Sequence, residues 1–224
     1  MKETSEHTNS YYAASKNWQT DYPKLEGDHH CDVAILGGGF TGVSAALRLI
    51  EHGYKVAVVE ANRISWGASG RNGGQLIDGF VNDLYKFEKK VGKRGAEIAY
   101  QMGIECRDLV LERIEKHSID CDLKFGFLDV AMNQGDIDDF HEWLEEKKEN
   151  NYPHKMEFIT QENLKQHVGS DKYIAGVVNY GNGHLHPLNL CIGEARAIVD
   201  QGGLIFEQSQ VKKIKHGENP KLIT

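Results

Sequence analysis

Residues 31–60, "CDVAILGGGFTGVSAALRLIEHGYKVAVVE", decide the fold. They open with a continuous apolar run of strand length that stops at glycine, which is typical of a buried parallel strand. The segment that follows has apolar residues at the spacing of one helical face, namely Val43, Ala46, Leu47 and Ile50. Gly53 ends that helix as a C-terminal cap, and "KVAVVE" is a second buried strand. The stretch therefore predicts a βαβ unit.

The turn inside this unit contains a GxGxxG pattern at Gly37, Gly39 and Gly42. The first glycine allows a tight turn, the second lets the backbone approach a pyrophosphate, and the third permits close packing of helix on sheet. An acid, Glu60, ends the second strand, where a carboxylate accepts hydrogen bonds from ribose hydroxyls. The sequence pattern of dinucleotide-binding βαβ units requires a strand before the glycines, a helix after them and an acid at the end of the next strand. All three are present here, so we prefer a nucleotide site to a glycine turn with a purely structural role.

A second glycine-rich segment follows, "GASGRNGGQ" at residues 67–75. An NAD domain would normally continue from Glu60 into another crossover helix and strand instead. Successive backbone amides at the glycines would form an anion-accepting concavity against a pyrophosphate and an isoalloxazine edge. Arg71 and Asn72 would add charge and hydrogen-bond donors there. The alternative is a solvated surface loop.

Three stretches, "SYYAAS", residues 32–75 and "GHLHPLNL", closely resemble the gamma-glutamylputrescine oxidoreductases of the glycine oxidase and D-amino acid oxidase-like FAD superfamily. The resemblance implies FAD as cofactor and oxidation of a small primary amine to an imine that hydrolyses to an aldehyde. Glycine or a D-amino acid is the alternative substrate, and a nucleotide-binding module without turnover is the alternative function. Together with the motifs, the resemblance assigns the following residues to the FAD site: Gly37, Gly38, Gly39, Phe40, Thr41, Gly42, Glu60, Ala61, Arg63, Ala68, Ser69, Arg71, Asn72, Gly73, Gly74, Gln75 and Val211.

The fold class expected is α/β, a Rossmann-type FAD-binding βαβ domain with part of an α+β substrate domain. We expect an N-terminal arm over residues 1–30 that Tyr11, Tyr12 and Trp18 pin to the surface. The first segment of the FAD-binding region would cover residues 31–90, a partial substrate region residues 91–187, and a return towards the FAD domain residues 188–224.

Periodicity predicts several further elements along the chain. Helices are expected over 95–117, 136–149 and 188–199, with a capped helix beginning at Thr160. Strands are expected over 125–132, 173–179, 203–207 and 209–214. "GNGHLHP", residues 181–187, is predicted to be a loop.

Composition argues against several function classes. The chain has 224 residues and a net charge of −7, with no basic run that marks a nucleic-acid or membrane face. Four widely spaced cysteines, in a chain that opens without a secretion signal, favour reduced thiols and the cytoplasm. "HHC" at 29–31 enters a strand and would point its side chains to opposite faces, so we expect no metal site. No signature for hydrolysis is present, and no catalytic side chain can be nominated.

Family members extend well beyond this length, so the chain resembles the N-terminal half of such an enzyme. We expect the 224-residue chain alone to show no amine oxidase turnover and to lose flavin readily on dilution. Uncovered apolar surface would also favour self-association.

Overall fold

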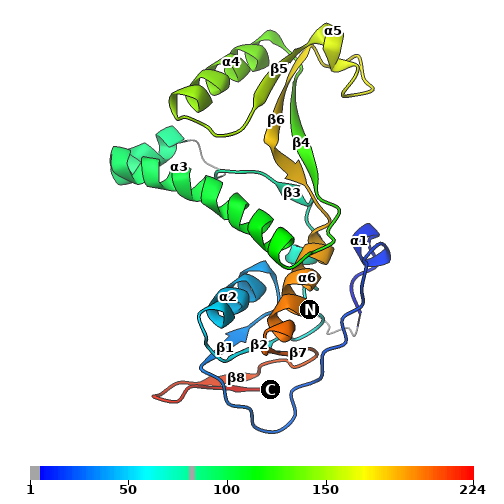
Figure 1. The fold of residues 1–224 in the computed structure, drawn as a ribbon, viewed down its shortest axis with the longest axis vertical. Helices are drawn as coiled ribbons and strands as arrows, with labels where there is room; N and C mark the ends of the chain where they lie inside the picture. Colours follow the sequence, from blue (N-terminus) through cyan, green and yellow to red (C-terminus); the bar gives the residue numbers. More distant parts are fainter. Residues whose placement is uncertain (1–5, 81–83) are drawn as a thin grey trace. The chain divides into compact units, whose positions relative to one another are not determined.

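The computed structural model describes residues 6–80 and 84–224 and divides into two compact units (Figure 1). Unit 1 comprises Met1–Gly74, Asp108–Asp122 and Leu185–Thr224. Unit 2 comprises Gln75–Arg107 and Leu123–His184. These boundaries differ from those of the regions expected from sequence, and the roles assigned to those regions stay predictions.

Unit 1 is built on a three-stranded parallel sheet in the order β1-β2-β7. The strands are β1 (Val33–Leu36), β2 (Val56–Val59) and β7 (Leu204–Phe206), and α2 (Phe40–Glu51) connects the first two. All four residues of the central strand β2 are buried, which explains its unbroken apolar sequence. The predicted βαβ unit is therefore confirmed, and Gly53 follows α2 in the left-handed conformation at φ 84°.

Two helices, α2 and α6 (Pro187–Asp200), pack on one face of this sheet. Their side chains close over Val56, Val58 and Ile205 in a core that includes Val43, Ala46, Leu47, Cys191, Ala195 and Ile198. Ala57, Val59 and Phe206 point to the opposite face, because successive strand residues alternate. There they meet Leu25 of the N-terminal arm together with Cys31, Val211 and Leu222.

The remaining elements of unit 1 are short. They are α1 (Tyr11–Ala14), the 3₁₀ turn η1 (Ala68–Gly70) and the antiparallel hairpin of β8 (Lys213–Lys215) and β9 (Lys221–Ile223). The predicted pinning of the arm is seen at two residues. The Tyr12 ring meets the His186 ring edge-on at 4.9 Å, and the Arg196 guanidinium lies 5.9 Å from the centre of the Trp18 ring.

Unit 2 is built on an antiparallel sheet around the long strand β6 (Ala175–His184). One side of β6 pairs with β4 (Lys124–Ala131). Its start and its end also pair, respectively, with β5 (Met156–Thr160) and β3 (Gln75–Leu76). Helix α4 (Gln134–Glu149) begins with a capping box between Asn133 and Asp136, and α5 (Gln161–Leu164) follows β5. Helix α3 (Leu84–Lys116) contributes to both units and is interrupted at Gly92, where φ is 73°.

Several expected elements need correction. Residues 181–184 are not loop but the end of β6, because Gly183 lets β4 approach so closely that a Cβ there would lie 2.0 Å from the Lys124 carbonyl oxygen. The expected strand over 209–214 is wrong over residues 209–212, since the Ser209 amide donates to the Glu60 carbonyl and β8 begins only at Lys213. Thr160 precedes α5 but makes no side-chain cap.

Candidate functional site

The glycine turn after β1 has the geometry that the fingerprint requires. Gly37 donates its amide to the Val59 carbonyl over 2.9 Å and adopts φ 101°, a conformation that favours glycine. A Cβ on Gly42 would lie 1.9 Å from the Gly37 carbonyl oxygen. The third glycine therefore allows α2 to start directly against the end of β1.

The amino end of α2 offers backbone amides rather than a side-chain cap. Its N-cap is Gly39, which makes no side-chain hydrogen bond to the first turn. The Phe40 amide donates to Ser69 Oγ over 3.0 Å, which ties the turn to the second glycine-rich segment. The partial positive charge of a helix amino end, together with its first amides, suits a phosphate.

Glu60 follows β2 directly and faces the glycine turn. Its Oε2 accepts from the Gly38 amide over 2.7 Å, and its Oε1 accepts from the Asn62 amide over 2.8 Å. An ionised carboxylate accepts about four hydrogen bonds, so two further donors such as ribose hydroxyls can be accommodated. Glu60 thus stabilises the glycine turn and can still accept hydrogen bonds from a ligand.

The glycines of residues 67–74 bring backbone segments close together. A Cβ on Gly70 would lie 2.3 Å from the Ser65 carbonyl oxygen. Gly74 has φ 67°, and a Cβ there would lie 2.0 Å from the Leu185 carbonyl oxygen. The Gly70 amide donates to the Gly67 carbonyl and the Gly74 amide to Asn72 Oδ1. The expectation that all four glycine amides face a ligand is therefore wrong for these two.

Arg71 and Asn72 also stabilise this segment. Arg71 donates Nε to the Gly67 carbonyl over 3.1 Å, and its guanidinium lies 4.9 Å from the centre of the Trp66 ring. Asn72 donates Nδ2 to the carbonyl oxygens of Ala68 and Ser69. Ala61, Ala68 and Gly73 lie along the same stretch of unit 1. Contact of any of these residues with a cofactor stays a prediction.

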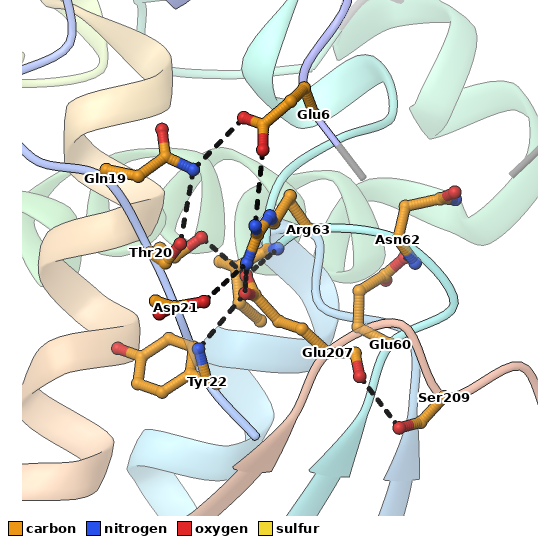
Figure 2. A network of polar contacts seen from close by, with 11 residues as sticks. Glu6, Gln19, Thr20, Asp21, Tyr22, Glu60, Asn62, Arg63, Glu207 and Ser209 are labelled. Atoms are coloured by element: carbon orange, nitrogen blue, oxygen red, sulfur yellow. Dashed lines mark hydrogen bonds and ion pairs between the residues drawn. The ribbon is translucent and has the colours of Figure 1, made fainter. Parts of the chain in front are cut away.

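Arg63 lies in a buried polar network that sequence reasoning did not find (Figure 2). Its guanidinium contacts the carboxylates of Glu207 at 2.9 Å and of Asp21 and Glu6 at 3.3 Å each. Burial acts to lower the pKa of Arg63, but these three acidic partners outweigh it and raise the pKa above its usual value. The sequence does contain one signal for this network: an acid, Glu207, directly follows β7, whose last two residues are buried, just as Glu60 follows β2.

Val211 and Gln75 are the last two expected site residues. Val211 packs against Ala57, Val59 and Phe206 on the face of the sheet opposite α2, just before β8. Gln75 belongs to unit 2, where it pairs with His184 in β3. Unit 1 therefore holds every predicted site residue except Gln75.

The histidines and cysteines form no metal centre among the described residues. No group of three or more potential ligands could hold a metal ion in residues 6–80 and 84–224.

His186 is the N-cap of α6 and accepts from the Asn189 amide, while burial lowers its pKa. The Cys191 thiol is buried beneath Gly38, which raises its pKa. Within the same ranges, no helix has the length and apolarity that crossing a bilayer requires.

The comparison with known proteins identifies the family. The model of the family "FAD dependent oxidoreductase" matches residues 32–223, from β1 to the end of β9. The chain belongs to this family. Its relatives include a probable oxidoreductase OrdL of Haemophilus influenzae, 46 % identical over 92 % of this chain and 48 % of the relative. The gamma-glutamylputrescine oxidoreductase of Escherichia coli is 44 % identical over 95 % of this chain and 50 % of its own length.

Solved structures agree with this family. Glycine oxidase from Bacillus cereus superposes with a TM-score of 0.63 at 25 % identity, over 84 % of this chain and 49 % of that protein. An L-amino acid deaminase from Proteus myxofaciens gives a TM-score of 0.73 at 20 % identity, over 89 % and 43 % of the two chains, which supports the fold. The chain spans about half the length of the curated relatives it matches. The predicted fold class and family resemblance are both confirmed.

The family depends on FAD, and the residues present fit this cofactor. Gly39, the N-cap of α2, gives no side-chain hydrogen bond to the first turn, where Ser69 Oγ accepts from the Phe40 amide. Gly42 keeps that helix close to β1. Glu60 stands at the carboxyl end of the next strand, the edge at which parallel sheets bind nucleotides. These features would suit the phosphate and the ribose of the adenosine half of FAD.

Proposed function

We propose that the protein acts as an FAD-dependent amine oxidoreductase on a small primary amine of the gamma-glutamylputrescine type. The single observation that carries this proposal is the 44 % identity to the Escherichia coli gamma-glutamylputrescine oxidoreductase, which runs over 95 % of this chain. Glycine oxidase, at 25 % identity, supports the amino-acid alternative less strongly.

Each part of the predicted cofactor site in unit 1 would bind a different part of FAD. The amides at the start of α2 would bind the pyrophosphate, and the Glu60 carboxylate would orient the adenosine ribose. The segment from Ala61 to Gly74 would lie along the cofactor, with Val211 beside the adenine. When bound, FAD supplies the acceptor for the two electrons that the amine carbon loses as it becomes an imine.

Anaerobic mixing tests the proposal. A protein loaded with FAD is combined in separate samples with gamma-glutamylputrescine, glycine and a D-amino acid, and the visible flavin absorbance is followed. Bleaching by gamma-glutamylputrescine at low concentration supports the proposal, and bleaching only by glycine or the D-amino acid favours the alternative. Because we expect the 224-residue chain alone to show no turnover, the same samples are also prepared with a full-length version of the protein. Retention of FAD by that version without bleaching by any of the three compounds favours a nucleotide-binding module without turnover.

We also propose the cytoplasm as the compartment and self-association as a property of the chain. The first is supported by the four cysteines, none of which forms a disulfide. The second is supported by apolar side chains that are about half exposed on one face of α3, Ile98 at 50 % and Met102 at 48 %. No nucleic-acid or membrane partner is proposed.

A further inference from the structure

Glu207 is a fully buried carboxylate with four hydrogen-bond donors (Figure 2). Its Oε1 accepts from Thr20 Oγ1 over 2.6 Å and from the Ile64 amide over 2.7 Å. Its Oε2 accepts from the Arg63 guanidinium over 2.9 Å and from the Tyr22 amide over 3.2 Å. Four donors match the accepting capacity of an ionised carboxylate, so its burial is compensated.

These donors come from two segments that are distant in sequence. Thr20 and Tyr22 belong to the N-terminal arm, and Arg63 and Ile64 belong to the segment after Glu60. The arm makes two more contacts in the same place. The Pro23 carbonyl accepts from the Glu207 amide, and the Leu25 amide donates to Ser209 Oγ over 2.8 Å. The arm therefore lies along residues 207–209, which in turn lie along residues 60–62.

The contacts continue from Glu207 to the predicted nucleotide site. The Glu60 amide donates to the Phe206 carbonyl, and the Glu60 carbonyl accepts from the Ser209 amide. Ile64, held by Glu207, packs so closely over Gly38 that a Cβ on that glycine would lie 2.4 Å from Ile64 Cδ1. Thus the chain on both sides of the Glu60 side chain is fixed by residues that Glu207 and the arm hold.

We propose that Glu207 is a positioning residue for the cofactor site and that the arm over residues 6–25 is a strap that completes it. Glu207 does not touch the cofactor; it sets where Glu60 and the glycine turn stand. Arg63 is bound by Glu207 and by two acids of the strap, Glu6 and Asp21, so it also belongs to the strap junction. The inference rests on the proposed FAD site.

The test uses substitutions that remove single contacts, with a matched control. Glu207→Gln removes the charge, and Thr20→Val removes one donor from the strap, whereas Thr20→Ser keeps the hydroxyl. Glu194→Gln serves as control because Glu194 is equally buried in unit 1 but pairs with Arg113 at 3.2 Å, apart from the strap. FAD dissociation constants are measured by flavin fluorescence well below each unfolding midpoint, and amide hydrogen exchange of residues 60–66 is measured without FAD.

The expected results separate positioning from general stability. Glu207→Gln should weaken FAD binding about tenfold or more and speed exchange at residues 60–66, because a buried charge-assisted network is disrupted. Thr20→Val should show both effects more weakly, and Thr20→Ser should restore wild-type values. Glu194→Gln should lower the unfolding temperature and leave FAD affinity within about twofold of wild type, since its partners lie elsewhere.

Two results would overturn the inference. One is unchanged exchange and unchanged FAD affinity in Glu207→Gln. The other is an equal loss of affinity in Glu194→Gln, which would reduce the effect to general destabilisation. If a full-length version of the protein fails to bind FAD, the proposed function fails, and the exchange data without FAD still decide whether the strap orders residues 60–66.

Discussion

Replacing Glu60 by glutamine should weaken both the folded chain and its affinity for FAD. The carboxylate accepts from two backbone amides, Gly38 at 2.7 Å and Asn62 at 2.8 Å, on different oxygens. Glutamine offers one oxygen, so one amide would face an NH₂ group and lose its acceptor. Loss of one charge-assisted hydrogen bond and an unsatisfied donor costs about 2 kcal/mol.

The two consequences can be measured separately. For a chain of this size, about 2 kcal/mol lowers the unfolding midpoint by roughly 4–8 °C, which calorimetry of the protein without FAD detects. Weaker bonds to the ribose hydroxyls should raise the FAD dissociation constant by about 5- to 150-fold, corresponding to roughly 1–3 kcal/mol. Fluorescence titration measures that constant at a temperature where both proteins are fully folded.

A matched variant separates charge from position. Glu218→Gln removes the same charge from an exposed residue of unit 1 and should leave both quantities unchanged. If Glu60→Gln binds FAD as tightly as wild type, the assignment of Glu60 to the ribose is wrong. If its unfolding midpoint is also unchanged, the carboxylate does not hold the turn.

Three further perturbations test other parts of the account. Gly42→Ala places a Cβ 1.9 Å from the Gly37 carbonyl oxygen and should lower the free energy of unfolding, measured by calorimetry, by about 1–3 kcal/mol or more. Gly67→Ala is the control, because a Cβ there meets nothing within 4 Å and should change stability little. Equal effects of the two variants would contradict close packing of α2 on β1. Burial lowers the pKa of His186 below its ordinary 6.5, so the unfolded chain takes up the proton first as the pH falls. The free energy of unfolding should therefore decrease below pH 6.5, and His186→Asn should reduce that decrease. An unaltered dependence of stability on pH in the variant would contradict this role of His186. Ile98→Lys should shift the chain towards monomer in sedimentation velocity, and unaltered sedimentation would count against α3 as the contact face.

The βαβ unit could be predicted because its signals are local. Apolar strands of four residues, one helical face and a glycine turn lie within about thirty consecutive residues, and the structure forms them as expected. Glu60 could be placed for the same reason, since it ends a strand whose position the pattern defines. The packing role of Gly42 also follows from its spacing.

Other features depend on contacts that no local pattern encodes. Thr20 and Glu207 are 187 positions apart, and their hydrogen bond exists only once the arm lies beside the end of β7. The sequence predicts a loop at the end of β6 because Gly181 and Gly183 have the composition of a turn. In the structure Gly181 makes room for the His154 side chain, and Gly183 makes room for the Lys124 carbonyl of β4. Similarly, Gly70 and Gly74 serve close backbone packing, so glycine content alone overstated the number of amides available to a ligand.

Amide hydrogen exchange with and without FAD would show where on the chain the cofactor binds. We predict that saturating FAD protects the glycine turn over residues 37–42, the segment 60–74 and the residues around Val211, and that Glu60→Gln reduces this protection. Protection confined to other segments, or none at FAD concentrations far above those at which relatives are saturated, would contradict the assignment of the cofactor to this site.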